Sequence, residues 1–244
     1  MNPTPSLFQR TRIKICGITR EADLDAAVAA GADAVGFVLY PPSPRFVTPE
    51  RAAELARRLP PFVTPVLLFV NASASELRAA NDVLPCALLQ FHGDETPQQC
   101  LEASHQGRHA WIRAARIPAG REDAFDLLKF AANFHSAQAI LLDAHVEGYG
   151  GGGTTFNWSR LPPSVESHLV LSGGLHAANV IDGLQQVWPR CRKTLAVDVS
   201  SGVEGPVKGI KDAARIHQFV AAVRAADEQR LAKAFHHADR IPPT

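Results

Sequence analysis

Short apolar runs alternate with amphipathic stretches along most of the chain. Eight runs rich in Val, Ile, Leu and Ala end at glycine, proline or a polar residue, which predicts β-strands. These strands are expected at residues 12–16, 34–39, 63–70, 87–92, 109–114, 139–143, 168–172 and 194–199. Helix signals follow Thr19 and occupy residues 49–59, 75–83, 97–106, 121–134, 177–188 and 210–225, whereas a glycine-rich loop follows the sixth strand.

The near-continuous apolar strands predict a parallel sheet that is buried on both faces. Eight strand–helix units within about 215 residues favour a closed barrel over an open sheet. The first strand is not followed by a G-x-G-x-x-G motif, so the fingerprint of a dinucleotide-binding fold is missing. We therefore predict an α/β fold, a single-domain (β/α)8 barrel of the TIM type, over residues 12–226. Residues 1–11 would be an N-terminal extension, and residues 227–244 a frayed helix plus tail.

Composition and charge narrow the range of partners. The 244-residue chain is 46% hydrophobic and 20% charged, which suits a sizeable core. Its formal net charge of +1 gives no reason to expect nucleic acid or an anionic membrane as a partner. No apolar stretch reaches the roughly 20 residues that cross a bilayer. The four cysteines, at positions 16, 86, 100 and 191, lack the spacing of a metal site, so a reducing, cytoplasmic location is expected.

The carboxyl ends of the strands indicate where chemistry would take place, because barrel enzymes build their active sites there. Cys16 ends the first strand with Lys14 on the same face, and Asp143 ends the sixth strand. A thiol serves as a base when its pKa is lowered, and a partly buried carboxyl group can serve as an acid. The alternatives are a cysteine that only packs, and an aspartate that pairs with Lys14 or Arg113.

Two loops of glycine and serine predict a phosphate site. Gly173 and Gly174 follow the seventh strand, and Ser200, Ser201 and Gly202 follow the eighth. Barrel enzymes frequently bind phosphate on the backbone amides of these two loops. Each loop could instead be an ordinary glycine turn, but two of them on adjacent strands favour phosphate.

Motifs stand on almost every strand: KICGIT (14–19), GFVLY (36–40), SPR (43–45), LQFHGDE (89–95), LD (142–143), YGGGGTTFNW (149–158), LSGGL (171–175) and VDVSSGVE (197–204). In this order they resemble the phosphoribosylanthranilate isomerase family of tryptophan biosynthesis. The resemblance covers residues 12–224. It implies a (β/α)8 barrel and an Amadori rearrangement, in which an aminoaldose phosphate becomes the corresponding aminoketose.

The resemblance also implies the two catalytic roles. Asp143 would protonate the ribose ring oxygen and open the ring to a Schiff base. Cys16 would then remove the proton from carbon 2. Because the reaction is redox-neutral, neither a cofactor nor a metal is implied, and the partner is a small phosphosugar substrate. A monomer is expected rather than a homodimer.

The remaining candidates would hold the substrate. Arg45 would receive the anthranilate carboxylate, because a planar guanidinium binds a carboxylate in a fork. Gln90 and His92 would line the pocket, and Asp198 would orient substrate hydroxyls or the phosphate loop. By the same resemblance, the phosphate ligands would be Gly173, Gly174, Ser200, Ser201 and Gly202.

The glycine-rich stretch 147–156 reads either as a lid over the substrate or as a floppy connector. It departs from the family, which more often has a lysine after Gly-Thr-Gly. Two other functions are weighed against the isomerase. A related aminoribotide isomerase of histidine biosynthesis would carry aspartate where Cys16 stands. From a different class, the chain could be a non-catalytic phosphosugar-binding barrel.

Overall fold

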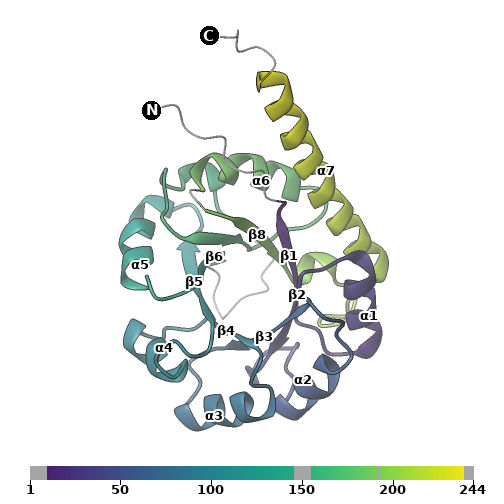
Figure 1. The fold of residues 1–244 in the computed structure, drawn as a ribbon, viewed down its shortest axis with the longest axis vertical. Coiled ribbons are helices and arrows are strands. Elements are labelled where there is room, and N and C mark those ends of the chain that lie inside the picture. The colour runs from purple at the N-terminus through teal and green to yellow at the C-terminus, as the bar shows by residue number, and fades with distance from the viewer. Residues whose placement is uncertain (1–9, 146–154, 192, 239–244) are drawn as a thin grey trace.

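Eight parallel strands close into a barrel in chain order, and β1 pairs with β8 to complete it (Figure 1). The computed structural model describes residues 10–145, 155–191 and 193–238. The strands are β1 (Arg12–Cys16), β2 (Ala34–Val38), β3 (Thr64–Phe69), β4 (Leu88–Phe91), β5 (Trp111–Pro118), β6 (Ala139–His145), β7 (His168–Leu171) and β8 (Leu195–Val199). The predicted (β/α)8 barrel is confirmed. Its largest difference from expectation is at β5, which continues to Pro118 instead of ending at residue 114.

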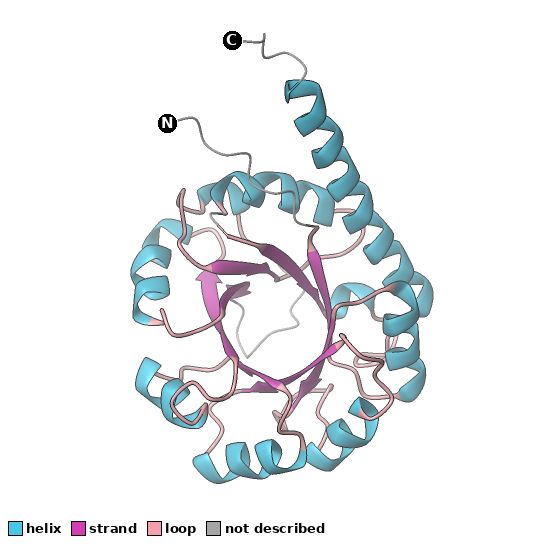
Figure 2. Ribbon diagram, viewed as in Figure 1, coloured by secondary structure: helices cyan, strands magenta, loops and turns pink. Residues whose placement is uncertain are grey.

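Helices surround the outside of the barrel (Figure 2). They are α1 (Glu21–Ala30), α2 (Pro49–Ala56), α3 (Ala74–Val83), α4 (Pro97–Ala103), α5 (Leu127–Asn133), α6 (Val180–Val187) and α7 (Ala213–Ala238). Short 3-10 helices are η1 (Glu122–Ala124), η2 (Trp158–Arg160), η3 (Trp188–Arg190) and η4 (Ser201–Val203). Between β6 and β7 the described residues hold η2 and no α-helix, in line with the loop predicted there. None of the described helices is both long and apolar enough to cross a membrane.

Alternate strand residues face opposite sides of the barrel wall. Outward-facing residues such as Ile15 and Phe37 join the helices in one large apolar core. Inward-facing residues form two small clusters without helix residues: one of Ile112, Ala114, Ala139, Leu141 and Val170, the other of Cys16, Val38, Leu68 and Val70. Leu88 of β4 and Ala196 of β8 pack against the first cluster. Residues two positions along a strand from a cluster residue face the same side, which places Lys14, Gln90, Asp143 and Asp198 inside the barrel.

Capping side chains decide where several helices begin. Ser73 and Thr96 each form a capping box at the start of α3 and α4. Helix α4 begins at residue 97 as expected, whereas Ser73 starts α3 one residue earlier than expected. Thr19 does not cap α1, whose N-cap position has no side-chain hydrogen bond. The helix expected over 121–134 is interrupted, because Asp126 accepts a hydrogen bond at the new N-terminus of α5.

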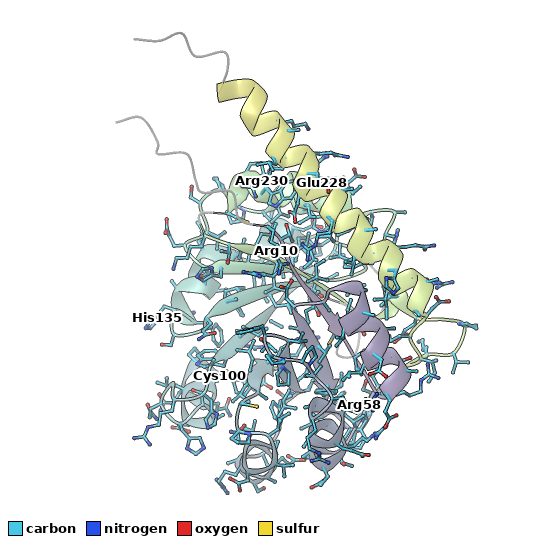
Figure 3. All side chains as sticks on the ribbon, turned by 45° about the vertical axis from the view of Figure 1, so that its right-hand side comes forward. Arg10, Arg58, Cys100, His135, Glu228 and Arg230 are labelled. Carbon is cyan, nitrogen blue, oxygen red and sulfur yellow. The ribbon has the colours of Figure 1, made fainter. Side chains whose placement is uncertain are left out.

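Helix α7 continues past the predicted end of the barrel domain. It runs to Ala238, so the boundary expected after residue 226 falls inside a helix. Asp227 is buried and accepts hydrogen bonds from the backbone nitrogen (3.0 Å) and the hydroxyl (2.7 Å) of Thr11. Arg230, labelled on α7 in Figure 3, places its guanidinium 4.9 Å from the ring centre of Trp188. The start of the predicted tail therefore packs against the barrel, because its charged residues find partners there.

Candidate active site

Lys14 of β1 and Asp198 of β8 form an ion pair inside the barrel. The strand register sets them opposite each other, and Lys14 Nζ lies 2.8 Å from Asp198 Oδ1. Both side chains are buried, and Asp198 Oδ2 accepts a second hydrogen bond from the Ser172 hydroxyl at 3.0 Å. The partner of Lys14 is thus Asp198 and not Asp143, which was one alternative open from the sequence.

Cys16 lies next to this pair, two residues after Lys14 on the same strand face. Burial raises the pKa of the Cys16 thiol, the Lys14 ammonium lowers it, and the Asp198 carboxylate raises it; the net shift is upward. Burial also lowers the pKa of Lys14, but Asp198 and Cys16 more than offset this, so that pKa is raised. Lys14 therefore favours the thiolate, as the sequence suggested, but the effect of burial on the Cys16 pKa is larger.

Gly36 of β2 leaves room for the thiol and the ammonium. It is the strand partner of Cys16. A Cβ atom at Gly36 would lie 2.7 Å from Cys16 Sγ and 3.0 Å from Lys14 Nζ, closer than nonbonded atoms normally approach. Gly36 was not among the predicted site residues. The available signal was a glycine inside an apolar strand, which indicates a close approach by another group.

A chain of hydrogen bonds runs from Gln90 through His92 to Asp143. Gln90 Nε2 lies 3.0 Å from His92 Nδ1, and His92 Nε2 lies 2.9 Å from Asp143 Oδ2. All three side chains are buried. An amide nitrogen only donates, so His92 Nδ1 accepts and the ring proton on Nε2 donates to Asp143. His92 thus orients the carboxyl group predicted to be the acid.

The second oxygen of Asp143 lies beside Gly173. A Cβ atom at Gly173 would lie 2.9 Å from Asp143 Oδ1 and 2.5 Å from the backbone nitrogen of Ala144. Gly173 also has a left-handed backbone, with φ 77°, which glycine adopts without strain. Within the described part of the chain, Asp143 Oδ1 makes no hydrogen bond. This oxygen is the one available to a substrate.

The two loops predicted to bind phosphate lie against each other. Gly174 has a left-handed backbone after β7, and Ser201 and Gly202 begin η4 after β8. A Cβ atom at Gly202 would lie 1.9 Å from the carbonyl oxygen of Leu175, so the loops touch through their backbones. Lys211 Nζ donates to the carbonyl oxygen of Ser200, in the second loop, at 3.0 Å.

Arg45, predicted to receive the substrate carboxylate, is buried and already pairs with Glu204. The Arg45 Nε and Nη2 atoms lie 2.6 and 2.9 Å from the two Glu204 oxygens. Burial raises the pKa of Glu204, but the hydrogen bond from Arg45 and the charge of Lys211 hold it below its usual value. Neither Glu204 nor Lys211 was predicted. Glu204 had a signal, its place in the VDVSSGVE motif, whereas no pattern marked Lys211.

Arg113, the other partner that the sequence allowed for Asp143, turns away from the site. Its guanidinium donates to the carbonyl oxygens of Phe91 and Gly93 at 2.9 Å each and lies 5.0 Å from the ring centre of Phe134. It therefore stays outside the barrel interior.

The predicted lid, 147–156, lies almost entirely outside the described residues. Across the described ranges, no group of three or more His, Cys, Asp or Glu side chains is arranged to hold a metal ion.

The chain matches known proteins over most of its length. Residues 13–222 fit the family model of N-(5'phosphoribosyl)anthranilate (PRA) isomerase. A curated N-(5'-phosphoribosyl)anthranilate isomerase from Methylibium petroleiphilum is 62% identical over 218 residues, which cover 89% of this chain and 96% of the relative.

Solved structures agree with the sequence relatives. The phosphoribosyl anthranilate isomerase from Thermotoga maritima is 37% identical with a TM-score of 0.73, and the match covers 88% of this chain and 99% of that one. A crystal structure of such an isomerase with reduced 1-(o-carboxyphenylamino)-1-deoxyribulose 5-phosphate is 35% identical, with a TM-score of 0.70 and the same coverage of both chains. By the family model and these relatives, the chain belongs to the N-(5'-phosphoribosyl)anthranilate isomerase family.

Proposed function

We propose that this protein isomerises N-(5'-phosphoribosyl)anthranilate in tryptophan biosynthesis, with Asp143 as general acid and Cys16 as general base. One observation carries the assignment of the two groups. Cys16 and Asp143 face the same barrel interior. A line of contacts runs from Lys14 through Asp198 to Ser172, whose backbone nitrogen donates to the carbonyl oxygen of Leu142 at 2.9 Å, and so connects β1 with β6. An aldose–ketose rearrangement needs such a pair, an acid and a base that act on neighbouring atoms of one substrate.

In the first step, Asp143 gives a proton to the ribose ring oxygen, and the ring opens to a Schiff base. His92 holds one carboxyl oxygen of Asp143 at 2.9 Å. The other oxygen, beside Gly173, is therefore the one that carries and delivers the proton. A general acid must lie within hydrogen-bond reach of its acceptor, and a carboxyl group fixed at one oxygen meets this requirement with the other.

In the second step, the Cys16 thiolate removes the proton from carbon 2, and the enolamine that forms tautomerises to the aminoketose. The Lys14 ammonium stabilises the thiolate against the effect of burial, which raises the pKa of Cys16. Turnover should therefore increase with pH as the thiolate becomes more abundant. After one cycle Cys16 is protonated and Asp143 ionised, and transfer of one proton from the thiol to the carboxylate restores the pair.

The two anionic ends of the substrate would be held by different groups beside this pair. We assign the phosphate to the backbone amides and hydroxyls of the Gly174 and Ser200 loops, and the anthranilate carboxylate to Arg45. A relative in the same family binds a reduced product analogue that carries both a phosphate and a carboxyphenyl group. Two anionic groups on one ligand fit a site that offers both a cation and an amide-rich loop.

We also propose that the protein is a monomer in the cytoplasm. All four cysteines are free, which agrees with a reducing compartment. One observation favours a homodimer instead: Phe62, between α2 and β3, is fully exposed with a left-handed backbone, φ 72°. A relative from Thermotoga maritima is described as dimeric. Size-exclusion chromatography with light scattering measures the oligomeric state. A wild-type dimer that dissociates into monomers in Phe62→Asp would contradict the proposed monomer.

The activity is tested by mixing the purified protein with freshly formed phosphoribosylanthranilate. Loss of the anthranilate-type fluorescence reports turnover, and mass spectrometry with periodate cleavage identifies the aminoketose. The aminoribotide of histidine biosynthesis serves as the second substrate. Turnover of phosphoribosylanthranilate alone supports the proposal. Turnover of the aminoribotide alone would replace it with the related isomerase, and turnover of neither would favour a binding protein.

A further inference from the structure

The guanidinium of Arg45 has two edges that can bind a carboxylate, and Glu204 occupies one of them. The hydrogen bonds to Glu204 come from Nε and Nη2, the side-on edge. Arg45 Nη1 makes no hydrogen bond to any residue in the described part of the chain. A second carboxylate can therefore meet Arg45 at its end-on edge, through Nη1 and Nη2, without displacing Glu204.

The stem of Arg45 passes close to two glycines and is buried. A Cβ atom at Gly17, the residue after Cys16, would lie 2.5 Å from Arg45 Cδ. A Cβ atom at Gly209 would lie 2.6 Å from the carbonyl oxygen of Pro44 and 3.9 Å from Arg45 Cγ. Freezing an arginine side chain costs about 2 kcal/mol of rotamer entropy. Here the side chain is frozen on folding, so substrate binding does not bear this cost.

Lys211 connects this arginine to the loop expected at the phosphate end. Its buried Nζ atom lies 3.1 Å from Glu204 Oε1 and donates to the carbonyl and hydroxyl oxygens of Ser200 at 3.0 and 3.3 Å. Two cations thus share one carboxylate. The formal charges of Arg45, Lys211 and Glu204 sum to +1, which is the charge needed to hold one more carboxylate.

We propose that Glu204 and Lys211 are positioning residues that aim the end-on edge of Arg45 at the anthranilate carboxylate of the substrate. Lys211 also fixes the distance between this arginine and the Ser200 loop, and so between the two anionic ends of the ligand. The inference rests on the proposed function, since it assumes an anthranilate substrate. It adds to that function the residues that make the site select for a carboxylate.

Two substrates that differ in one group test the inference. Condensation of ribose 5-phosphate with anthranilate gives the natural substrate, and condensation with aniline gives the same molecule without the carboxylate. The measured quantity is the ratio of kcat/KM for the two substrates. The variants are Glu204→Gln, Lys211→Met and Arg45→Met, with Glu21→Gln as the matched control at a surface carboxylate that pairs with Arg51.

For Glu204→Gln we expect kcat/KM for the anthranilate substrate to fall about 10- to 100-fold, mainly through KM, because Arg45 loses its fixed direction. Turnover of the aniline analogue should change little, so the ratio should approach that of Arg45→Met. Lys211→Met should lower the ratio. It should also lower kcat/KM for both substrates, because the Ser200 loop loses its hydrogen bonds to Lys211. Glu21→Gln should leave the ratio as in wild type.

A uniform loss on both substrates in Glu204→Gln, with a lowered ratio only in Arg45→Met, would overturn the inference and leave Glu204 a structural role. Equal kcat/KM on both substrates in wild type would also overturn it, although the proposed function would stand. If wild type acts on neither substrate, the proposed function fails and the inference fails with it. Glu204→Asp, which keeps the charge on a shorter stem, provides the same comparison if Glu204→Gln does not fold.

Discussion

Lys14 and Asp198 form a buried ion pair, 2.8 Å long, across the seam where β1 and β8 close the barrel. Removing one partner of such a pair leaves an uncompensated charge, which typically costs about 3–5 kcal/mol. The pair stands next to Cys16, and the Lys14 ammonium is the strongest influence that favours the thiolate. Its position therefore links the stability of the barrel seam to the chemistry of the proposed base.

The pH dependence of Cys16 alkylation tests this link. The thiolate is the reactive form, so the alkylation rate follows its population. Burial raises the pKa of Cys16 and Lys14 opposes the rise, so Lys14→Met should raise that pKa further and move the rate profile to higher pH. The measurement is the rate of iodoacetamide labelling at Cys16 by peptide mass spectrometry between neutral and alkaline pH.

Two further variants control for indirect effects. Lys14→Met with Asp198→Asn also removes a carboxylate that raises the Cys16 pKa, so its profile should shift less than that of Lys14→Met alone. Lys129→Met removes an exposed lysine and should leave the profile unchanged. An identical profile in wild type and Lys14→Met would show that Lys14 does not act on the thiol.

Gly36→Ala tests the space that the thiol and ammonium share. The new methyl group would lie 2.7 Å from Cys16 Sγ and 3.0 Å from Lys14 Nζ, so both groups must move. We expect kcat/KM to fall about 10- to 100-fold, because small displacements of reacting groups are costly. Gly205→Ala is the control, since a Cβ atom there would meet its nearest neighbour, the Ile210 oxygen, at 4.0 Å. An equal fall of kcat/KM in both variants would show that the space at Gly36 has no special role in catalysis.

His92→Phe tests whether the histidine orients the acid or binds the substrate. The change removes the donor to Asp143 Oδ2 and keeps a ring of similar size. We expect kcat to fall about 10- to 100-fold with little change in KM, because the carboxyl group loses its direction. Gln90→Leu should have a smaller effect in the same direction, since it removes only the group that sets the ring tautomer. A raised KM with unchanged kcat would instead make His92 a binding residue.

The barrel could be predicted because it follows from local patterns. The alternation of Cys16 with Ile15, and the glycines after the seventh and eighth strands, place groups at one end of a parallel barrel. The pairings could not be predicted. Lys14 joins Asp198, and Asp143 joins His92, because of barrel closure and strand stagger, which no segment encodes alone.

Residues that support other site residues through hydrogen bonds were also not predicted. Lys211 follows no motif, and its contacts with Ser200 and Glu204 depend on how the last loop folds back. The continuation of α7 past residue 226 was not predicted for a similar reason. Asp227 looks like the start of a polar tail, but it is buried against Thr11 at the other end of the domain.

Asp227→Ala tests whether this contact stabilises the barrel. The change leaves the backbone nitrogen and hydroxyl of Thr11 without their buried acceptor, which should cost about 2 kcal/mol. For a domain of this size the melting temperature should fall by about 4–8 °C. Glu228→Ala, at the exposed neighbouring position labelled in Figure 3, should leave it unchanged. A wild-type melting temperature in Asp227→Ala would mean that the contact adds no stability.

The most direct test of the central claim is turnover of phosphoribosylanthranilate by wild type, Cys16→Ala, Asp143→Ala and the double variant. A general acid or base typically contributes about 10²- to 10⁴-fold, so each single variant should lose at least that much in kcat while remaining folded. The loss in the double variant should be smaller than the product of the two single losses, because the two groups act as a unit in one reaction. Wild-type turnover in either single variant would contradict the assignment of that residue.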